Sequence, residues 1–534
     1  MNKKLVVILI MVTAVLFACS QRNGENNADT DNVNTSGMPI VEDAIELDVF
    51  ARQAFISNDN WNDVLVFNEY EDMTNIKVNW QMNPDNVVEE KLNLSLGGGD
   101  LPDAYHSNYI SDNDMLKYGE QGLFVPLNDL IDEYAPNFKK VLEDNPVIEK
   151  QITLPDGNIY AFPMIVDEEF FSYRTREKPW INEKWLDNLN MDMPETTEEF
   201  YDYLKAVKEG DPTGNGESDI TPYGGREIDP LFNYLKGSFG VANKGGENAN
   251  VDVDPATGEM RFFPISDNYK NLLEYMHRLY SEELIAQNIF SIDDEQYRAN
   301  VGEGKYGSTV FYNPEVSVGG DHVKDFTGMP ALEGPEGKKE FITLISEVVN
   351  ISAFIITKDN DHPEATVRWI DHFYGEEGMK LFFLGVEGET YEINENGEAE
   401  FMDHIINSDE GNTMQQEQSK YLTFHGGGFP SLITEEYFQG AAESSEKAIE
   451  AAEILEPDVV ENPWPSFMYT EEETKKLDTF GKDIEKYVVE MRDKFISGET
   501  SLDEWDAYVD TIQSMKLEDY MAIKEAALKR FDEN

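Results

Sequence analysis

The loop at residues 211–219, Asp-Pro-Thr-Gly-Asn-Gly-Glu-Ser-Asp, carries oxygen-bearing groups at the spacing of a calcium-binding loop. Calcium prefers roughly six to eight oxygen ligands, which alternate along such loops around a sharp turn at a glycine, here Gly216. Pro222 stands where the loop usually ends in a glutamate, and an ordinary Asp/Asn/Gly turn is the alternative. We predict a structural Ca²⁺ held by the side chains of Asp211, Thr213, Asn215 and Asp219 and by the main-chain carbonyl of Glu217.

The chain offers little for catalysis. Its seven histidines show no zinc-ligand spacing, and no Gly-x-Ser-x-Gly motif marks a nucleophilic serine. A pair of carboxylates could serve a glycosidase, but among 106 acidic residues any such pair carries no information. The triglycine runs at 97–99 and 426–428 lack the Lys-Ser/Thr of a phosphate-binding loop. We predict a protein that is not an enzyme and needs no cofactor for chemistry.

The only cysteine, Cys19, ends the first apolar segment of the chain. Two lysines precede an apolar run at 5–18, which is shorter than the ~20 helical residues that span a bilayer. These proportions are typical of a secretory signal, and Leu-Phe-Ala-Cys at 16–19 resembles the lipobox of bacterial lipoproteins. We predict a signal peptide at 1–18, lipid on Cys19 and anchoring to the outer face of the cell membrane. A plain secretory peptide with a chance cysteine is the alternative.

The composition limits the kinds of molecule that the protein can bind. The net charge of −64 argues against binding nucleic acid or anionic lipid through the bulk surface. The acidic charge favours solubility in a saline or alkaline medium. An alternative interpretation of the charge is that the protein binds a cationic ligand. Residues 19–42 are mostly polar and predict a flexible tether. The rest of the 534-residue chain is too long for one hydrophobic core, so at least two lobes are expected.

Alternating apolar residues predict strands at 45–49, 76–80 and 104–105, separated by two helices. This β-α-β-α-β order implies a parallel sheet covered by helices. In such sheets, ligands bind beyond the carboxyl ends of the strands. The side chains that follow these strands, and that we expect to bind a ligand, are Asn60, Trp61, His106, Ser107, Asn108 and Tyr109.

Several motifs resemble those of one protein family. Residues 91–103, Lys-Leu-Asn-Leu-Ser-Leu-Gly-Gly-Gly-Asp-Leu-Pro-Asp, resemble the signature Lys-x-Asn-x-x-x-Ala-Ser-Gly-Asp-Leu-Pro-Asp of the family 1 extracellular solute-binding lipoproteins. Residues 157–163 resemble the family's Gly-x-x-Tyr-x-x-Pro, and 194–200 its Pro-x-Thr-x-x-Glu-Phe. Later matches lie at 362–365, 385–388 and 495–506. Members of this family are the binding subunits of carbohydrate ABC importers.

The resemblance implies an α/β fold of two hinged lobes, the type II periplasmic-binding-protein-like fold. Residues 43–165 would form the N-terminal lobe, completed by roughly 345–400, and 166–344 the C-terminal lobe. Residues 401–534 would form a helical part shared between the lobes. The implied function is capture of an oligosaccharide or polysaccharide fragment in the interlobe cleft and its delivery to an ABC transporter permease, with the protein a monomer. Some family members carry a comparable calcium loop.

The resemblance also adds candidate residues to the site. Asp167, Glu168 and Arg174 follow the Gly-x-x-Tyr-x-x-Pro segment. Tyr312 and Asn313 follow a predicted strand at 307–311, where the family often carries an aromatic residue. Trp464 lies in Asn-Pro-Trp-Pro, which predicts an exposed loop whose indole could pack on a sugar. The tryptophans inside helical patterns are expected in the core: Trp185, Trp369 and Trp505.

Local helix signals complete the prediction. Thr196 with Glu199, Thr470 with Glu473 and Ser501 with Glu504 form capping-box patterns.

Two other functions remain open at this point. One is a secreted enzyme acting on polysaccharide, and the other is a receptor for peptides or cations.

Overall fold

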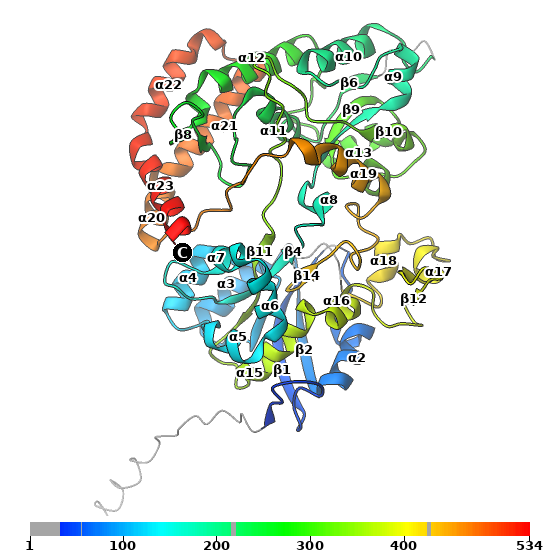
Figure 1. Cartoon of the computed structure of the whole chain (residues 1–534), viewed down its shortest axis with the longest axis vertical. Coiled ribbons are helices and arrows are strands. Elements are labelled where there is room, and N and C mark those ends of the chain that lie inside the picture. Colours follow the sequence, from blue (N-terminus) through cyan, green and yellow to red (C-terminus); the bar gives the residue numbers. More distant parts are fainter. Residues whose placement is uncertain (1–31, 55, 215–219, 424–428, 534) are drawn as a thin grey trace, which may run out of the picture.

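The computed structural model describes residues 32–533 except 55, 215–219 and 424–428. The predicted signal peptide and lipidated Cys19 therefore lie outside the described residues. Figure 1 shows two lobes, one above the other, joined by several crossing segments. We call the lower one lobe 1, which holds a six-stranded sheet, and the upper one lobe 2, which holds a four-stranded sheet. The prediction of a hinged two-lobe α/β fold is confirmed.

The sheet of lobe 1 has the order β14-β4-β11-β3-β1-β2. Its strands are β1 (Ile45–Gln53), β2 (Ile76–Pro84), β3 (Ala104–His106), β4 (Ala161–Val166), β11 (Val348–Ile356) and β14 (Leu432–Ile433). Val49 of β1 lies opposite Trp80 of β2 and Ala104 of β3, and both pairings are parallel, as predicted. Only β11 runs antiparallel to its neighbours, because the chain enters it from lobe 2, at the end where β4 leaves.

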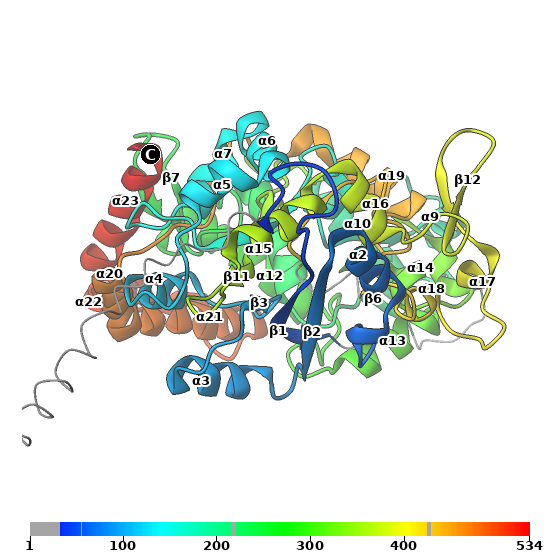
Figure 2. The same cartoon turned by 90° about the horizontal axis from the view of Figure 1, so that it is seen from below.

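Helices cover both faces of this sheet because its strands alternate their apolar side chains. Leu47 and Val49 of β1 face one core cluster, and Phe50 faces the other. The helices of lobe 1 are α2 (Leu65–Thr74), α3 (Val88–Gly98), α4 (Asp112–Glu120), α5 (Asn128–Tyr134), α6 (Pro136–Asp144), α7 (Pro146–Ile152), α15 (Pro363–Asp371), α16 (Glu376–Phe383), α17 (Asp403–Ile406) and α18 (Met414–Gln418). A small hairpin of β12 (Tyr391–Ile393) and β13 (Ala399–Phe401) extends from this lobe, as Figure 2 shows.

Lobe 2 has the strand order β10-β5-β9-β6. Its strands are β5 (Lys178–Asn182), β6 (Thr221–Tyr223), β9 (Tyr306–Phe311) and β10 (Phe326–Gly328), with a separate hairpin of β7 (Val251–Val253) and β8 (Met260–Phe262). Its helices are α9 (Glu183–Leu189), α10 (Thr197–Glu209), α11 (Asp229–Lys236), α12 (Asp267–Ser281), α13 (Asp294–Gly302), α14 (Pro314–Ser317) and α19 (Glu446–Leu455). The short helix α8 (Phe171–Arg174) lies between the lobes, on the segment from β4 to β5.

The C-terminal helices pack mainly on lobe 2 and also contact lobe 1. They are α20 (Glu471–Lys476), α21 (Lys482–Ser497), α22 (Trp505–Ser514) and α23 (Leu517–Glu533), with a π-helical turn between α20 and α21. Thr474 of α20 donates a hydrogen bond to Asn113 of α4, 2.5 Å away. The Lys150 ammonium of α7 lies 5.9 Å from the Phe531 ring centroid. β14 lies in the sheet of lobe 1, and the core of this lobe also contains Phe401, Ile405, Tyr437, Phe438 and Ala441. The first part of the segment predicted to be shared, 401–534, therefore packs with lobe 1.

The local helix signals have mixed outcomes. Both capping boxes, Thr196 with Glu199 and Thr470 with Glu473, form at the starts of α10 and α20. Ser501 instead caps a short 3-10 turn: its hydroxyl accepts from the amide of Asp503, and its main-chain carbonyl accepts from the amide of Glu504. The three tryptophans expected in the core, Trp185, Trp369 and Trp505, are buried. No helix in the described part of the chain is long and apolar enough to cross a membrane.

Candidate functional site

A cavity of about 250 Å³ lies between the lobes, beside the segment that leads into β11. Lobe 1 contributes Asp112 and Gln151, and lobe 2 contributes Glu247. Val348, Val349 and Ile351 of β11 add to the wall from lobe 1. The rest comes from the segments that cross between the lobes and from the segment that leads into α20: Arg176, Ile345, Ser346, Pro465, Ser466 and Met468. Because its walls come from both lobes and from the crossings, a hinge motion must change the shape of this cavity.

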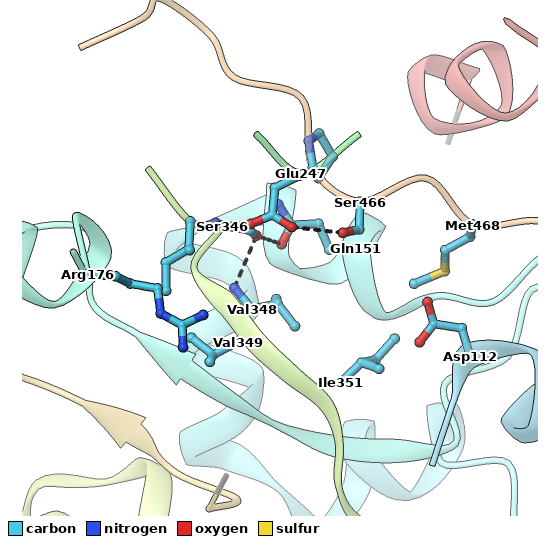
Figure 3. Close-up of a pocket in the computed structure, with 12 residues that line it drawn as sticks. Asp112, Gln151, Arg176, Glu247, Ser346, Val348, Val349, Ile351, Ser466 and Met468 are labelled. Carbon is cyan, nitrogen blue, oxygen red and sulfur yellow. Dashed lines mark hydrogen bonds between the residues drawn. The ribbon is translucent and has the colours of Figure 1, made fainter. Parts of the chain in front are cut away.

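The cavity has an apolar wall between polar ends. Figure 3 shows Val348, Val349 and Ile351 of β11 between the Arg176 guanidinium on one side and the Asp112 carboxylate on the other. Such a surface suits a ligand with apolar C–H faces and many hydroxyl groups.

Asp112 is the first residue of α4, whose N-cap is Ser111. Helix amides favour a carboxylate at this position. Burial nevertheless raises the pKa of Asp112 above its usual value, and its own main-chain amide opposes the shift. The Asp112 carboxyl is half-buried at the cavity wall, where its oxygens can accept hydrogen bonds from a ligand.

Arg176 follows α8 and has a left-handed backbone, with φ of 47°. Burial disfavours the charge of its guanidinium, but Tyr312, Tyr173 and Glu443 more than offset this, so its pKa stands above the usual value. The buried ammonium of Lys178 donates to the main-chain carbonyls of Ser172 (2.8 Å) and Arg176 (3.1 Å). These two bonds hold the turn that presents Arg176 to the cavity.

Three tyrosines gather around the end of α8: Tyr173 of α8 has Tyr109 of lobe 1 and Tyr312 of lobe 2 as neighbours. Burial raises the pKa of the Tyr173 phenol, and the proximity of Glu443, Tyr109 and Tyr312 raises it further. Tyr109 is 49% exposed and adopts a left-handed φ of 50°. Left-handed backbone is uncommon outside glycine and occurs often at ligand sites, where the surrounding structure holds it.

A chain of hydrogen bonds runs across the top of the cavity in Figure 3. The Ser346 hydroxyl donates to Oε1 of Gln151 at 2.6 Å and accepts from the amide of Val348 at 3.2 Å. Glu247 accepts from the amide of Ser346 at 3.4 Å and from the hydroxyl of Ser466 at 3.0 Å. These bonds join lobe 1, a crossing segment and lobe 2.

A second cavity of about 650 Å³ lies on the other side of these bonds and also takes its walls from both lobes. Three predicted residues line it: Glu168, Arg174 and Trp464. Arg174 is buried, and its guanidinium pairs with Glu347 at 2.8 Å. Trp464 is half-buried and packs on Phe467, with ring centroids 5.5 Å apart. The structure thus places these three residues together in the second cavity rather than in the first.

Trp61 and His106 lie beneath the cleft rather than in it. They are 3% and 1% exposed and pack edge-to-face at 5.4 Å, with Trp80 against both. Burial lowers the pKa of His106 to about 3, so its imidazole is neutral. Both side chains point into the core because β1, β2 and β3 pack their aromatic residues together there. Neither ring presents a face to a ligand in this structure.

The other predicted residues mostly shape the backbone. Asn60 caps the turn that starts at Trp61, and Asn313 caps α14. Asn108 donates to the carbonyls of Phe50 and His106, and its Oδ1 is buried with no partner in the described part of the chain. Ser107 (φ 57°) donates its amide to the carbonyl of Ala353, and Asp167 accepts from the amide of Glu169.

The predicted calcium loop lies partly outside the described residues. Asp211 accepts from the Thr213 hydroxyl at 3.0 Å and from the amide of Gly214 at 2.8 Å. Asn215, Glu217 and Asp219 are not described. No group of three His, Cys, Asp or Glu side chains able to hold a metal ion occurs among the described residues.

None of the residues predicted from the sequence is among those that line the first cavity. Asp112 and Arg176 each lie within a few residues of a predicted segment, so extending the strand-end loops would have included them. Gln151, Glu247, Ser466 and Met468 have no local signal, because only tertiary packing brings them to the cavity.

Comparisons with known proteins agree with this architecture. The family described as bacterial extracellular solute-binding protein matches residues 59–380. The chain is 28% identical over 547 residues to the fructooligosaccharide ABC transporter substrate-binding protein FusA of Streptococcus pneumoniae, covering 99% of this chain and 98% of FusA. It is 24% identical over 461 residues to the polygalacturonan/rhamnogalacturonan-binding protein YtcQ of Bacillus subtilis, covering 84% of each.

Solved structures of FusA are similar as well. FusA in complex with kestose matches with a TM-score of 0.73 and 28% identity, covering 92% of this chain and 99% of FusA. An EF-hand mutant of FusA in complex with fructo-nystose gives a TM-score of 0.73 at 27% identity, with the same coverage.

Proposed function

The chain belongs to the bacterial extracellular solute-binding proteins, and on this premise we propose that it captures an oligosaccharide between its lobes and delivers it to the permease of an ABC importer. The observation that carries the proposal is the interlobe cavity, whose apolar wall lies between the polar side chains of Asp112 and Arg176. A family of solute-binding proteins gives no support to the alternative of a secreted enzyme.

The chemistry of the cavity fits a sugar. Sugar rings present apolar C–H faces and hydroxyl edges, so they pack on aromatic or aliphatic side chains and bond to planar polar groups. Here Tyr109, Tyr173 and Tyr312 would supply the faces, while Asp112 and Arg176 would bond the hydroxyls. The cavity is slightly smaller than the roughly 300–1,000 Å³ of sites that enclose drug-sized ligands, so it would hold one end of a chain.

The remaining predicted residues take other roles in the proposal. Asn108 and the backbone of Ser107 would hold Tyr109, with Trp61, His106 and Asn60 forming the layer below. Asn313 bonds the Ser445 hydroxyl at 2.6 Å and so would fix the backbone after Tyr312. Glu168, Arg174, Asp167 and Trp464 would belong to the hinge and the second cavity.

Ligand capture would work by closure of the lobes. A ligand that contacts both lobes favours the closed state by its extra contacts there, and the permease would recognise that state. Cys19 would carry two acyl chains and the tether at 19–42 would hold the monomer outside the membrane. A structural Ca²⁺ at 211–219 is supported by its ligand spacing and by the EF-hand named for FusA.

Isothermal titration of the purified full chain with neutral and acidic oligosaccharides, peptides and polyamines tests the function. We expect stoichiometric binding of a saccharide and no product on prolonged incubation. Turnover to product would instead indicate an enzyme, and exclusive binding of peptides or polyamines would overturn the saccharide proposal.

A matched pair of tyrosine variants tests the site. Tyr312→Ala should weaken binding by roughly three- to tenfold, because an aromatic contact is worth ~0.5–1.5 kcal/mol. Tyr280→Ala, on the far helix α12, should leave the Kd unchanged. Equal effects of both variants would contradict the assignment.

A further inference from the structure

Two arginines beside the proposed sugar-stacking tyrosines, Arg52 and Arg226, are paired with carboxylates. Arg52 lies 4.8 Å from the Tyr109 ring centroid and pairs with Asp85 at 2.5 Å. Arg226 lies 5.9 Å from the Tyr312 ring centroid and pairs with Glu177 at 2.8 Å. Each arginine therefore flanks a proposed sugar-stacking tyrosine while its charge is compensated by the protein itself.

The other cationic side chains near the cavity also have ion-pair or hydrogen-bond partners within the protein. Arg174 pairs with Glu347 at 2.8 Å on the far side of the crossing segment. Lys178 is fully buried, and its ammonium bonds two main-chain carbonyls. Lys91, next to the end of β2, donates to the Asn83 side chain at 2.9 Å. Lys244 reaches only the second cavity, where it donates to the carbonyl of Glu461 at 3.3 Å.

Among the described residues that line the first cavity, Arg176 is the only one with a cationic side chain. Among the described residues, no carboxylate lies within ion-pair distance of its guanidinium, and Tyr312 and Glu443 are its charged or polar neighbours. One guanidinium can bond sugar hydroxyls as well as an acid, so its presence does not by itself require an anionic ligand.

Carboxylates outnumber this single arginine. Asp112 and Glu247 line the cavity, and Glu443 lies beside Arg176 and Tyr173. In the described part of the chain, none of these three has an ion-pair partner. An uncharged sugar would use them as hydroxyl acceptors, whereas a sugar acid would meet like charge in a site with little water.

We propose that this protein takes uncharged oligosaccharides and excludes uronates and sulfated sugars, because its cavity is lined by the carboxylates of Asp112 and Glu247 and by one arginine, Arg176, which has Glu443 beside it. This inference rests on the proposed function. The ligand of this chain would then be uncharged, like the fructooligosaccharides for which FusA is named. It would differ in charge from the polygalacturonan and rhamnogalacturonan for which YtcQ is named.

The test compares ligands of matched length on the full chain by calorimetry. The neutral set is fructo-, malto-, xylo- and cello-oligosaccharides, and the acidic set is oligogalacturonates and oligoalginates. We expect at least one neutral ligand to bind at least 100-fold more tightly than every acidic one, with a Kd that changes less than about twofold from low to high salt, because no ligand charge is screened. Tighter binding of an acidic ligand overturns the inference but keeps saccharide binding. Binding of neither set overturns the proposed function and the inference with it.

A shape-preserving pair of substitutions tests whether the carboxylates cause this discrimination. Asp112→Asn with Glu247→Gln preserves shape and removes two negative charges, so the discrimination against oligogalacturonate should fall at least tenfold. Glu120→Gln, exposed at the other end of α4, is the control and should leave it unchanged. An undiminished ratio in the double variant, with an unchanged thermal midpoint, would overturn the electrostatic basis.

Discussion

At the scale of single residues, Lys178 links burial to the geometry of the site. Its side chain is fully buried in β5, and its ammonium bonds the carbonyls on either side of the turn that ends at Arg176. Burial lowers its pKa to about 8, with Glu443 opposing the shift. The charge is therefore retained at neutral pH at an energetic cost, and it is used to hold the Arg176 backbone in a left-handed conformation.

This predicts a specific pH dependence of stability. Between pH 8 and the unfolded pKa near 10.5, the unfolded chain binds more protons at Lys178, so the free energy of unfolding should rise with pH. From pH 7.5 to 9.5, Lys178 should raise the free energy of unfolding by roughly 2 kcal/mol, and Lys178→Met should lack this contribution. Urea unfolding at the two pH values measures the free energy of unfolding.

The control for Lys178 is Lys184→Met, at an exposed position on α9. Lys236, whose pKa burial also lowers to about 8, titrates in all three proteins and cancels in the comparison. Equal pH dependence in wild type and Lys178→Met would contradict the prediction.

Local sequence could identify some of these residues but not their surroundings. Tyr109 and Tyr312 follow strands, and strand ends are where α/β proteins bind ligands, so position along the chain was informative. The same rule selected Trp61 and His106, which are buried, because chain position does not say to which side a side chain turns.

At the scale of elements, helix starts were predictable because capping is a local interaction. Thr196 accepts from the amide of Glu199 at 3.1 Å, and Glu199 accepts from the amide of Thr196 at 3.1 Å. Thr196→Ala should lower the free energy of unfolding by ~1 kcal/mol, whereas Thr196→Ser, which keeps the hydroxyl, should cost little. Chemical denaturation measures both, and an equal loss in the two variants would exclude the cap as the cause.

The loop between α10 and β6 gives a second prediction for an element. If Ca²⁺ binds there, a chelator should lower the Tm by several degrees, because a ligand at 100 times its Kd stabilises by ~2.7 kcal/mol. Asp211→Ala should lower the Tm of the calcium-loaded protein and abolish the response to the chelator. Differential scanning calorimetry with and without EDTA measures the Tm of each protein. An unchanged wild-type Tm would contradict calcium binding by this loop.

At the scale of the whole molecule, the hinge is built from three chain crossings and a hydrogen-bonded bridge. The segments into β5, β11 and α19 pass between the lobes, and Ser346 bonds both Gln151 of lobe 1 and Glu247 of lobe 2. Few residues need to change their backbone angles for the lobes to rotate about these crossings.

Closure predicts a change of shape on binding. A saturating oligosaccharide should reduce the radius of gyration in small-angle X-ray scattering, because contacts with both lobes favour the closed state. Arg176→Gln should require more ligand for the same change, as it removes a contact from one wall of the cleft. A radius that stays constant at saturation would contradict a hinged receptor.

The sequence by itself determined the acidic charge, the helix caps, the parallel strand order and the family motifs, because each depends on composition or on neighbours along the chain. Only the tertiary structure decided that Asp112, Arg176, Glu247 and Met468 share a cavity. They come from four separate segments of the chain, and no local pattern specifies which side chains meet when two lobes pack around a hinge.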